Sequence, residues 1–200
     1  MKVYIAGVSH FDPLCRGRLR QWLQFLSESN RSVSSPSFLA TEWDSSLFAQ
    51  VKKQRPAFAK QIQNEWKGIR PDVLKTLELS LGYEADSHLD VFPDVEMLWL
   101  DEGRDYDDIA DYAEQRLHIY KRFLGGSSLQ KDCGNVLALL GDAAERGSQG
   151  STNGDERDQK FASLILQRLV DDGDKWAIAV VGANHANDYP QTMRRLFTIA

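Results

Sequence analysis

The residues best suited to chemistry in this sequence are two histidines near opposite ends of the chain. His10 follows the apolar segment 3–6, His185 follows the apolar segment 176–182, and each histidine stands three residues after a glycine. Short runs of consecutive apolar residues predict strands that are buried on both faces. Ligands bind beyond the carboxyl ends of the strands in an open parallel sheet. If both strands run parallel in one sheet, we therefore expect the two imidazoles at the same rim.

A carboxylate completes a set of residues that could bind a metal or move protons. Glu42 follows a third apolar segment, 38–40. Imidazole and carboxylate are common ligands of catalytic transition metals, and three such ligands leave one position open for water. A bound divalent ion would lower the pKa of that water to about 7. Without a metal, His10, Glu42 and His185 could instead serve as general base, general acid and orienting group.

Arg157 and Glu84 are candidate catalytic residues. Arg157 lies in the first turn of a predicted helix, where a cation opposes the helix dipole. It either pairs with Glu156 or Asp158 or holds an anion, since its planar fork suits a carboxylate or a developing oxyanion. Glu84 lies in a loop after a glycine, where it could act as a base or as a further ligand.

The remaining histidines and one pair of charges have simpler explanations. His88 lies in a predicted loop, and we expect it at the surface. His118 falls within a predicted helix and is expected to be structural or solvated. Asp101 and Arg104 follow a predicted strand, and a structural salt bridge is the expected role of this pair.

Apolar segments that predict strands alternate along the chain with helical patterns. The strands are predicted at 3–6, 38–40, 95–100 and 176–182. The helices are predicted at 19–26, 45–81, 109–124, 136–144, 155–169 and 189–197, with Pro56 and Pro71 interrupting the second of them. No hairpin pattern is present. This alternation favours an α/β fold with a mainly parallel central sheet flanked by helices.

Composition limits the class of protein and its partners. A length of 200 residues suits a single domain, 1–200, with a flexible Gly/Ser-rich loop at 147–154. The net charge of −5 argues against a nucleic-acid partner, and no apolar run approaches the length that spans a bilayer. Two cysteines without metal spacing and the lack of a leader predict a cytoplasmic protein. An acidic stretch at 101–114 could instead contact a partner protein.

The order of these motifs resembles the TraB/PrgY/GumN/TIKI family, which is related to the erythromycin-esterase-like and ChaN-like proteins. The similarity rests on paired GxxH motifs, an Asp-Arg pair, a Gly-x-Glu and a Glu-Arg-Asn segment before the last strand. The corresponding segments here are Gly7–His10, Thr41–Asp44, Gly82–Glu84, Leu100–Arg104, Glu156–Asp158 and Gly182–His185. Asp158 stands where the family has Asn, Asn184 stands where it has Gly, and the Asp-Arg pair is split by two residues.

The resemblance implies a hydrolase with its site at one rim of the sheet. Some relatives are described as divalent-metal-dependent proteases, which implies Mn, Co or Zn bound by His10, Glu42 and His185 and a peptide or small-molecule substrate. Relatives in the esterase-like branch are thought to use histidine as a base without metal, and ChaN-like proteins bind haem. The expected function is therefore hydrolysis of a peptide or ester bond by activated water. The alternative is a non-catalytic protein of the same fold that binds haem, a metal or a small ligand, and the departures at Asp158 and Asn184 favour it.

Overall fold

The central feature of the computed structural model is one parallel β-sheet. The structure describes residues 2–10, 12–30, 35–103, 112–124, 155–172 and 176–182. In this part of the chain the strands are β1 (Lys2–Val8), β2 (Phe38–Thr41), β3 (Glu96–Trp99) and β4 (Trp176–Gly182). Their spatial order is β1-β4-β2-β3, and every neighbouring pair is parallel. The predicted α/β fold with a parallel sheet is confirmed at this level, whereas the finer TIKI-like architecture stays a prediction.

The last strand in the sequence lies in the middle of the sheet. All seven residues of β4 are buried, and β1 and β2 pair with its two edges. Ile178 and Val180 pack on one face, while Ala177 and Ala179 pack on the opposite face. Two apolar faces on one strand are what a fully covered parallel sheet requires.

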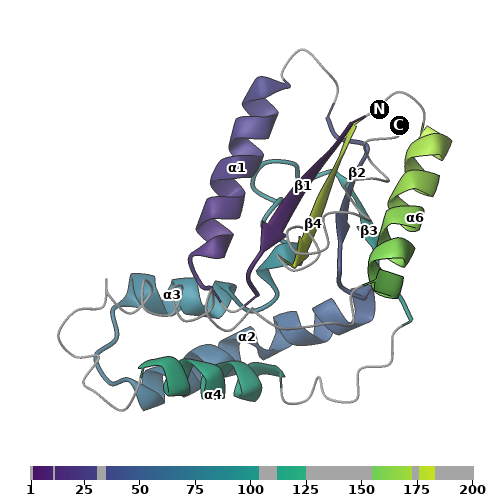
Figure 1. Cartoon of the computed structure of the whole chain (residues 1–200). Helices are drawn as coiled ribbons and strands as arrows, with labels where there is room; N and C mark the ends of the chain where they lie inside the picture. The colour runs from purple at the N-terminus through teal and green to yellow at the C-terminus, as the bar shows by residue number, and fades with distance from the viewer. Residues whose placement is uncertain are drawn as a thin grey trace.

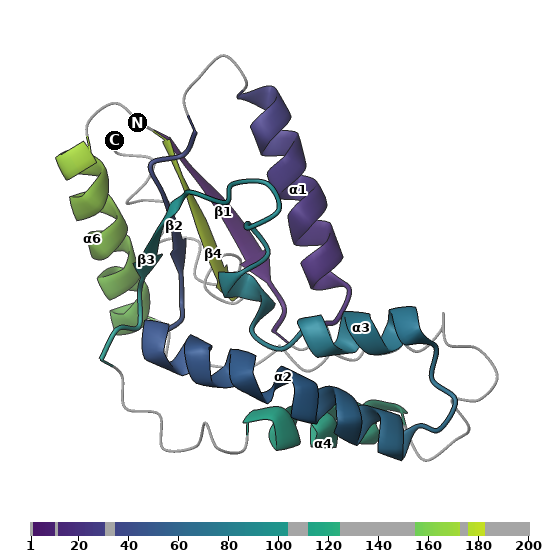
Figure 2. The same ribbon diagram turned by 180° about the vertical axis from the view of Figure 1, so that it is seen from behind.

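Helices cover both faces of the sheet and its carboxyl end. Helix α1 (Cys15–Ser29) lies on one face and α6 (Asp155–Asp172) on the other (Figure 1). Helices α2 (Ser45–Glu65), α3 (Pro71–Leu79) and α4 (Tyr112–Leu124) form a layer beyond the arrowheads of β1 and β4, as both views show (Figure 2). This layer places α2 and α4 next to the rim at which the strands end.

The layer at the carboxyl end has an apolar core of its own. Val51, Phe58 and Ile62 of α2 pack with Leu77 of α3 and Tyr120 of α4. These side chains are buried, so the three helices hold one another in place in addition to their contacts with the sheet.

Two prolines predicted to interrupt the region 45–81 behave differently. Pro71 begins α3, where its missing N–H costs no helical hydrogen bond. Pro56 lies inside α2, which continues through it to Glu65, so the predicted interruption at Pro56 is wrong. Arg55, the residue before Pro56, gives a physical reason why the helix continues. Arg55 is buried and donates to the carbonyl oxygen of Leu81 from Nε at 2.9 Å and from Nη2 at 2.7 Å, which anchors this turn of α2.

Several predicted features lie outside the described residues. They are the helices at 136–144 and 189–197, the loop at 147–154, most of the acidic stretch and His185. Among the helices that the structure describes, none is long and apolar enough to span a membrane.

Neighbouring leucine and isoleucine residues on α6 give a matched test of how this helix faces the sheet. Ile165 is fully buried in the apolar core between α6 and the sheet, whereas Leu164 is 36% exposed. Ile165→Ala is expected to lower the free energy of unfolding by about 2–5 kcal/mol, because it leaves a cavity. Leu164→Ala should cost less than about 1 kcal/mol. Urea denaturation of both variants measures the two losses of unfolding free energy. Equal losses would contradict the orientation of α6 in which Ile165 faces the sheet and Leu164 faces solvent.

Candidate active site

The candidate site is built from residues that follow the carboxyl ends of three strands. His10 stands two residues after β1, Glu42 directly follows β2, and Asp101 comes two residues after β3. Arg157 reaches the same place from the first turn of α6. This is the rim at which ligands bind in parallel α/β sheets.

His10 is held between two buried carboxylates. Its Nε2 lies 2.5 Å from Oε1 of Glu42, and its Nδ1 lies 2.7 Å from Oε1 of Glu84. The side chain of His10 is 34% exposed, whereas those of Glu42 and Glu84 are 3% and 0% exposed. Solvent therefore reaches the imidazole, while both carboxylates stand behind it.

Glu84 is fixed by a short helix and by an indole. It lies in the 3₁₀-helix η1 (Tyr83–Ala85), which begins after Gly82 in the left-handed conformation at φ +69°. A Cβ at Gly82 would also stand 3.3 Å from Val51, so glycine suits this turn on both counts. The indole Nε1 of Trp43 donates to Oε2 of Glu84 at 3.3 Å. Both oxygens of Glu84 thus have a defined donor.

The two carboxylates determine the protonation of His10. Burial by itself would lower the pKa of this imidazole. The charge and hydrogen bond of Glu42, together with those of Glu84, outweigh burial and raise the pKa of His10 well above its usual value. At neutral pH the ring is therefore a cation that donates from both nitrogens.

Arg157 is positioned by a residue far away in the sequence. Its Nε donates to Oδ1 of Asp101 at 3.3 Å and its Nη2 pairs with Oδ2 of the same carboxylate. The guanidinium also lies over the ring of Phe161, 4.9 Å from the centroid, and its Nη2 is 3.8 Å from Oε2 of Glu42. Asp101 is a partner that neither expectation for Arg157 included, since these were a pair with Glu156 or Asp158 and the binding of an anion.

Sequence reasoning missed two residues at the site, Trp43, which donates to Glu84, and Arg116. Arg116 of α4 is buried, and it donates to the backbone oxygen of His10 and to the hydroxyl of Tyr112, the latter at 2.7 Å. It therefore ties α4 to the backbone of the site. The sequence pattern could have indicated Arg116. This arginine lies on the apolar face of α4 with Ala113, Leu117 and Tyr120, where a charged side chain needs a buried partner.

The remaining histidines have structural or solvated positions. His88 is only 3% exposed, so the expectation that it lies at the surface is wrong. Burial lowers the pKa of His88, with the charge of Asp86 acting in the opposite sense. His118 is exposed on α4. Asp101 has a structural ion pair as expected, but with Arg157; Arg104 lies outside the described residues.

The described residues do not fit a metal site. No group of three or more His, Cys, Asp and Glu side chains in the ranges that the structure describes is arranged to hold an ion. Nε2 of His10 and Oε1 of Glu42 are 2.5 Å apart, whereas two ligands at about 2.1 Å from one tetrahedral ion stand more than about 3 Å apart. The third predicted ligand, His185, lies outside the described residues, so metal binding stays a prediction.

The structure does bring together the two strands that carry the predicted histidines. β1 and β4 are parallel neighbours, and Val8 is level with Gly182. The glycines of the two GxxH motifs are therefore one residue out of register, since Gly7 is level with Val181. The strand pairing on which the convergence of the two histidines depends is confirmed, and the position of the His185 ring stays a prediction.

Comparisons of the chain with family models, with curated proteins and with solved structures give no match. The resemblance to the TraB/PrgY/GumN/TIKI family therefore stays a prediction from the motifs. The function has to be argued from the site itself.

Removing the charge of Glu84 tests the origin of the raised pKa. Glu84→Gln keeps an oxygen for Nδ1 of His10 but removes one of the two carboxylates that stabilise the imidazolium. We expect the pKa of His10 to fall towards its usual range, as measured by NMR titration of the ring protons. Glu78→Gln, which removes a carboxylate from an ion pair with Lys75 on α3, should leave the pKa of His10 unchanged.

The same variant changes the dependence of stability on pH. Because the pKa of His10 is higher in the folded chain than in the unfolded chain, its contribution to stability is complete below about pH 6.5. The contribution is lost as the pH rises through the folded pKa. In Glu84→Gln this loss should occur at lower pH. Identical pH profiles of the melting temperature in the two proteins would contradict the assignment.

Proposed function

We propose that this chain is a hydrolase that cleaves a peptide or ester bond by activated water at His10. The observation that carries the proposal is the continuous chain of side chains Glu84–His10–Glu42, in which an accessible imidazole is held between two buried carboxylates. Groups of this kind supply proton transfer in enzymes, where an acid and a base must be adjacent and differ in protonation. The order of the motifs, which resembles the TraB/PrgY/GumN/TIKI family, supports the same reaction class.

In the proposed reaction Glu42 acts as the general base and His10 acts as the general acid. In the resting site Nε2 of His10 carries a proton and Glu42 is the facing carboxylate. As a water attacks the carbonyl carbon, one of its protons passes to Glu42, and the hydroxyl bonds to the carbon. When the tetrahedral intermediate collapses, Nε2 of His10 gives its proton to the leaving nitrogen or oxygen. The proton on Glu42 then returns to His10, which restores the starting state.

Glu84 and Arg157 have supporting roles in this scheme. Glu84 accepts from Nδ1 of His10, which fixes the ring orientation and stabilises the cation. Asp101 holds the guanidinium of Arg157, whose Nη2 is 3.8 Å from Glu42, so the negative charge that develops on the carbonyl oxygen would form beside a fixed cation. Preorganised donors of this kind are usually the largest single contribution to catalysis.

The alternative function, haem binding through a histidine, has less support at His10. A haem iron needs an unprotonated imidazole nitrogen. Both nitrogens of His10 face carboxylates at hydrogen-bonding distance, and the cationic ring has no lone pair to offer. The same geometry suits proton transfer. The cytoplasm remains the compartment in which we propose that the protein acts, because of its cysteine usage.

Replacing the central imidazole tests the proposal directly. His10→Gln should reduce hydrolysis of a panel of p-nitrophenyl esters and blocked peptides by about a hundredfold or more, because the acid is lost. His118→Gln changes the exposed histidine of α4 and serves as the matched control. Full activity in a folded His10→Gln protein would overturn the proposal. In the parent protein, kcat/KM should decline as the pH rises through the raised pKa of His10, since the acid form is then lost.

Arg157 gives a second, independent test. Arg157→Gln removes the cation beside Glu42 and should lower kcat by about a hundredfold, with a smaller change in KM, because the developing charge exists only in the transition state. Arg168→Gln is the control on the same helix, where the arginine pairs with Glu96 at 2.5 Å at the surface. An equal effect of both substitutions would indicate that Arg157 acts only on the stability of α6.

A further inference from the structure

We propose that the candidate active site selects a substrate that carries a carboxylate close to the bond that is cleaved. This inference rests on the proposed hydrolase function, and it specifies the chemical class of the substrate. It follows from the accessibility of the charged side chains at the site. Solvent reaches two cations, whereas the carboxylates that pair with them lie behind.

The exposure of the charged side chains at the site depends on their sign. The side chain of His10 is 34% exposed and that of Arg157 is 29% exposed. The carboxylates that these two cations face, those of Glu42, Glu84 and Asp101, are at most 3% exposed. A substrate that approaches from solvent therefore meets positive charge first.

The two accessible cations are close enough to act on one anionic group. Nε2 of His10 lies 2.5 Å from Oε1 of Glu42, and Nη2 of Arg157 lies 3.8 Å from Oε2 of the same carboxylate. One buried carboxylate thus separates the imidazolium from the guanidinium. Both nitrogens of His10 face carboxylates, so the ring attracts an anion by its charge, and we expect Arg157 to donate the hydrogen bonds.

The surroundings of Arg157 suit a carboxylate ligand. Asp101 and the ring of Phe161 fix the orientation of the guanidinium. A guanidinium carries five N–H donors in one plane, so an arginine that is held by one carboxylate can also bind a second one. Because carboxylates of the protein stand behind the cations, a singly charged ligand meets less repulsion than a doubly charged phosphate. An acidic side chain or the carboxyl end of a peptide would supply such a group.

Two further carboxylates stand at this rim of the sheet. Asp44 is buried and accepts from backbone N–H groups at the start of α2. Glu102 is exposed and accepts from Oγ of Ser45 at 3.1 Å. The charge of Glu102 opposes the binding of an anion, so its removal should have the opposite effect to the removal of Arg157.

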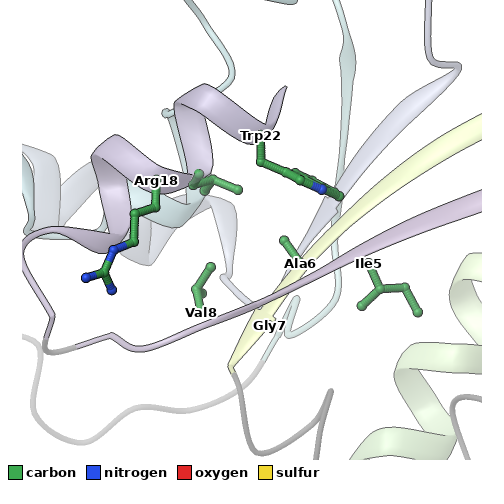
Figure 3. Close-up of a pocket in the computed structure, with 7 residues that line it drawn as sticks. Ile5, Ala6, Gly7, Val8, Arg18 and Trp22 are labelled. Carbon is green, nitrogen blue, oxygen red and sulfur yellow. The ribbon is translucent and has the colours of Figure 1, made fainter. Parts of the chain in front are cut away.

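An arginine elsewhere in the fold provides a matched control. Arg18 of α1 lines a hollow of about 230 Å³ between this helix and residues 5–8 of β1 (Figure 3). Its side chain is 61% exposed and its Nη1 lies 3.0 Å from the buried carboxylate of Asp12. Arg18 is therefore an accessible arginine that is held by a buried aspartate, as Arg157 is. None of the residues that line this hollow belongs to the candidate site.

Matched substrates that differ only in charge test the inference. One library of blocked hexapeptides contains aspartate and glutamate, a second contains asparagine and glutamine in their place, and a third repeats the second with a free carboxyl end. The esters p-nitrophenyl p-carboxybenzoate and p-nitrophenyl p-carbamoylbenzoate form a further pair. We expect about tenfold higher kcat/KM for the carboxylate member, mainly through a lower KM, and a decline of this preference with added salt. Preference for the first or the third library identifies the side chain or the chain end as the source of the carboxylate.

Three variants locate the origin of the preference. Arg157→Gln should abolish it, in addition to the loss of kcat that charged and neutral substrates share. Arg18→Gln removes the same charge from the protein and should keep the preference, whereas Glu102→Gln should increase it. A preference that Arg18→Gln also abolishes would overturn the inference, because it would then arise from the overall charge. The comparison of paired substrates in the parent protein does not depend on the folding of any variant.

The outcomes separate this inference from the proposed function. Equal cleavage of charged and neutral substrates, by an activity that depends on His10, would overturn the substrate class and leave the hydrolase intact. If no substrate is cleaved, the hydrolase proposal fails, and NMR titration with benzoate and benzamide decides whether the site binds a carboxylate. Saturable shifts of the amide resonances around Arg157 with benzoate alone would support the carboxylate site. Equal shifts with both compounds, or none with either, would overturn it.

Discussion

The site depends on one imidazolium ring that lies between two buried carboxylates and pairs with both. Removing a carboxylate from water costs several kcal/mol unless a charged or hydrogen-bonding partner is in place. Glu42 and Glu84 are almost completely buried, and His10 faces both of them through its two nitrogens. The pairing of His10 with Glu42 and Glu84 therefore has two roles. The proton that makes the ring a cation stabilises the buried carboxylates, and it is also available for transfer to a substrate.

The order of the strands explains how His10 and Glu42 meet. They follow β1 and β2, which are not neighbours, because β4 lies between them. Strands two places apart in a sheet are separated by about 10 Å. The side chains of His10 and Glu42 span this gap across the carboxyl end of β4, and η1 adds Glu84 from the helical layer beyond the rim. The central strand thus determines the distance that the two side chains must cover.

Charged side chains of both signs surround this contact. His10 in its cationic form, Arg116 and Arg157 face the carboxylates of Glu42, Glu84 and Asp101. Burial alone would lower the pKa of Arg116, but Tyr112, Tyr120 and Glu84 raise it, so the guanidinium remains charged. Such a network is costly to disturb, since removing one member leaves an uncompensated charge. Within this network solvent reaches the side chains of His10 and Arg157. The other charged side chains are buried and hold these two in position.

The sequence by itself determined the strands, most of the helices and the residues that close each strand. Runs such as 38–40 and 176–182 are apolar at successive positions and short, which favours a strand covered on both faces. The parallel sheet then implied that His10, Glu42 and His185 share a rim, and of these His10 and Glu42 lie in the part of the chain that the structure describes. The tertiary structure decided the partners. Trp43, Arg116 and the pairing of Arg157 with Asp101 depend on contacts between residues far apart in the chain, which no local pattern encodes. The continuation of α2 through Pro56 and the burial of His88 have the same origin, because packing against other elements overrides local preference.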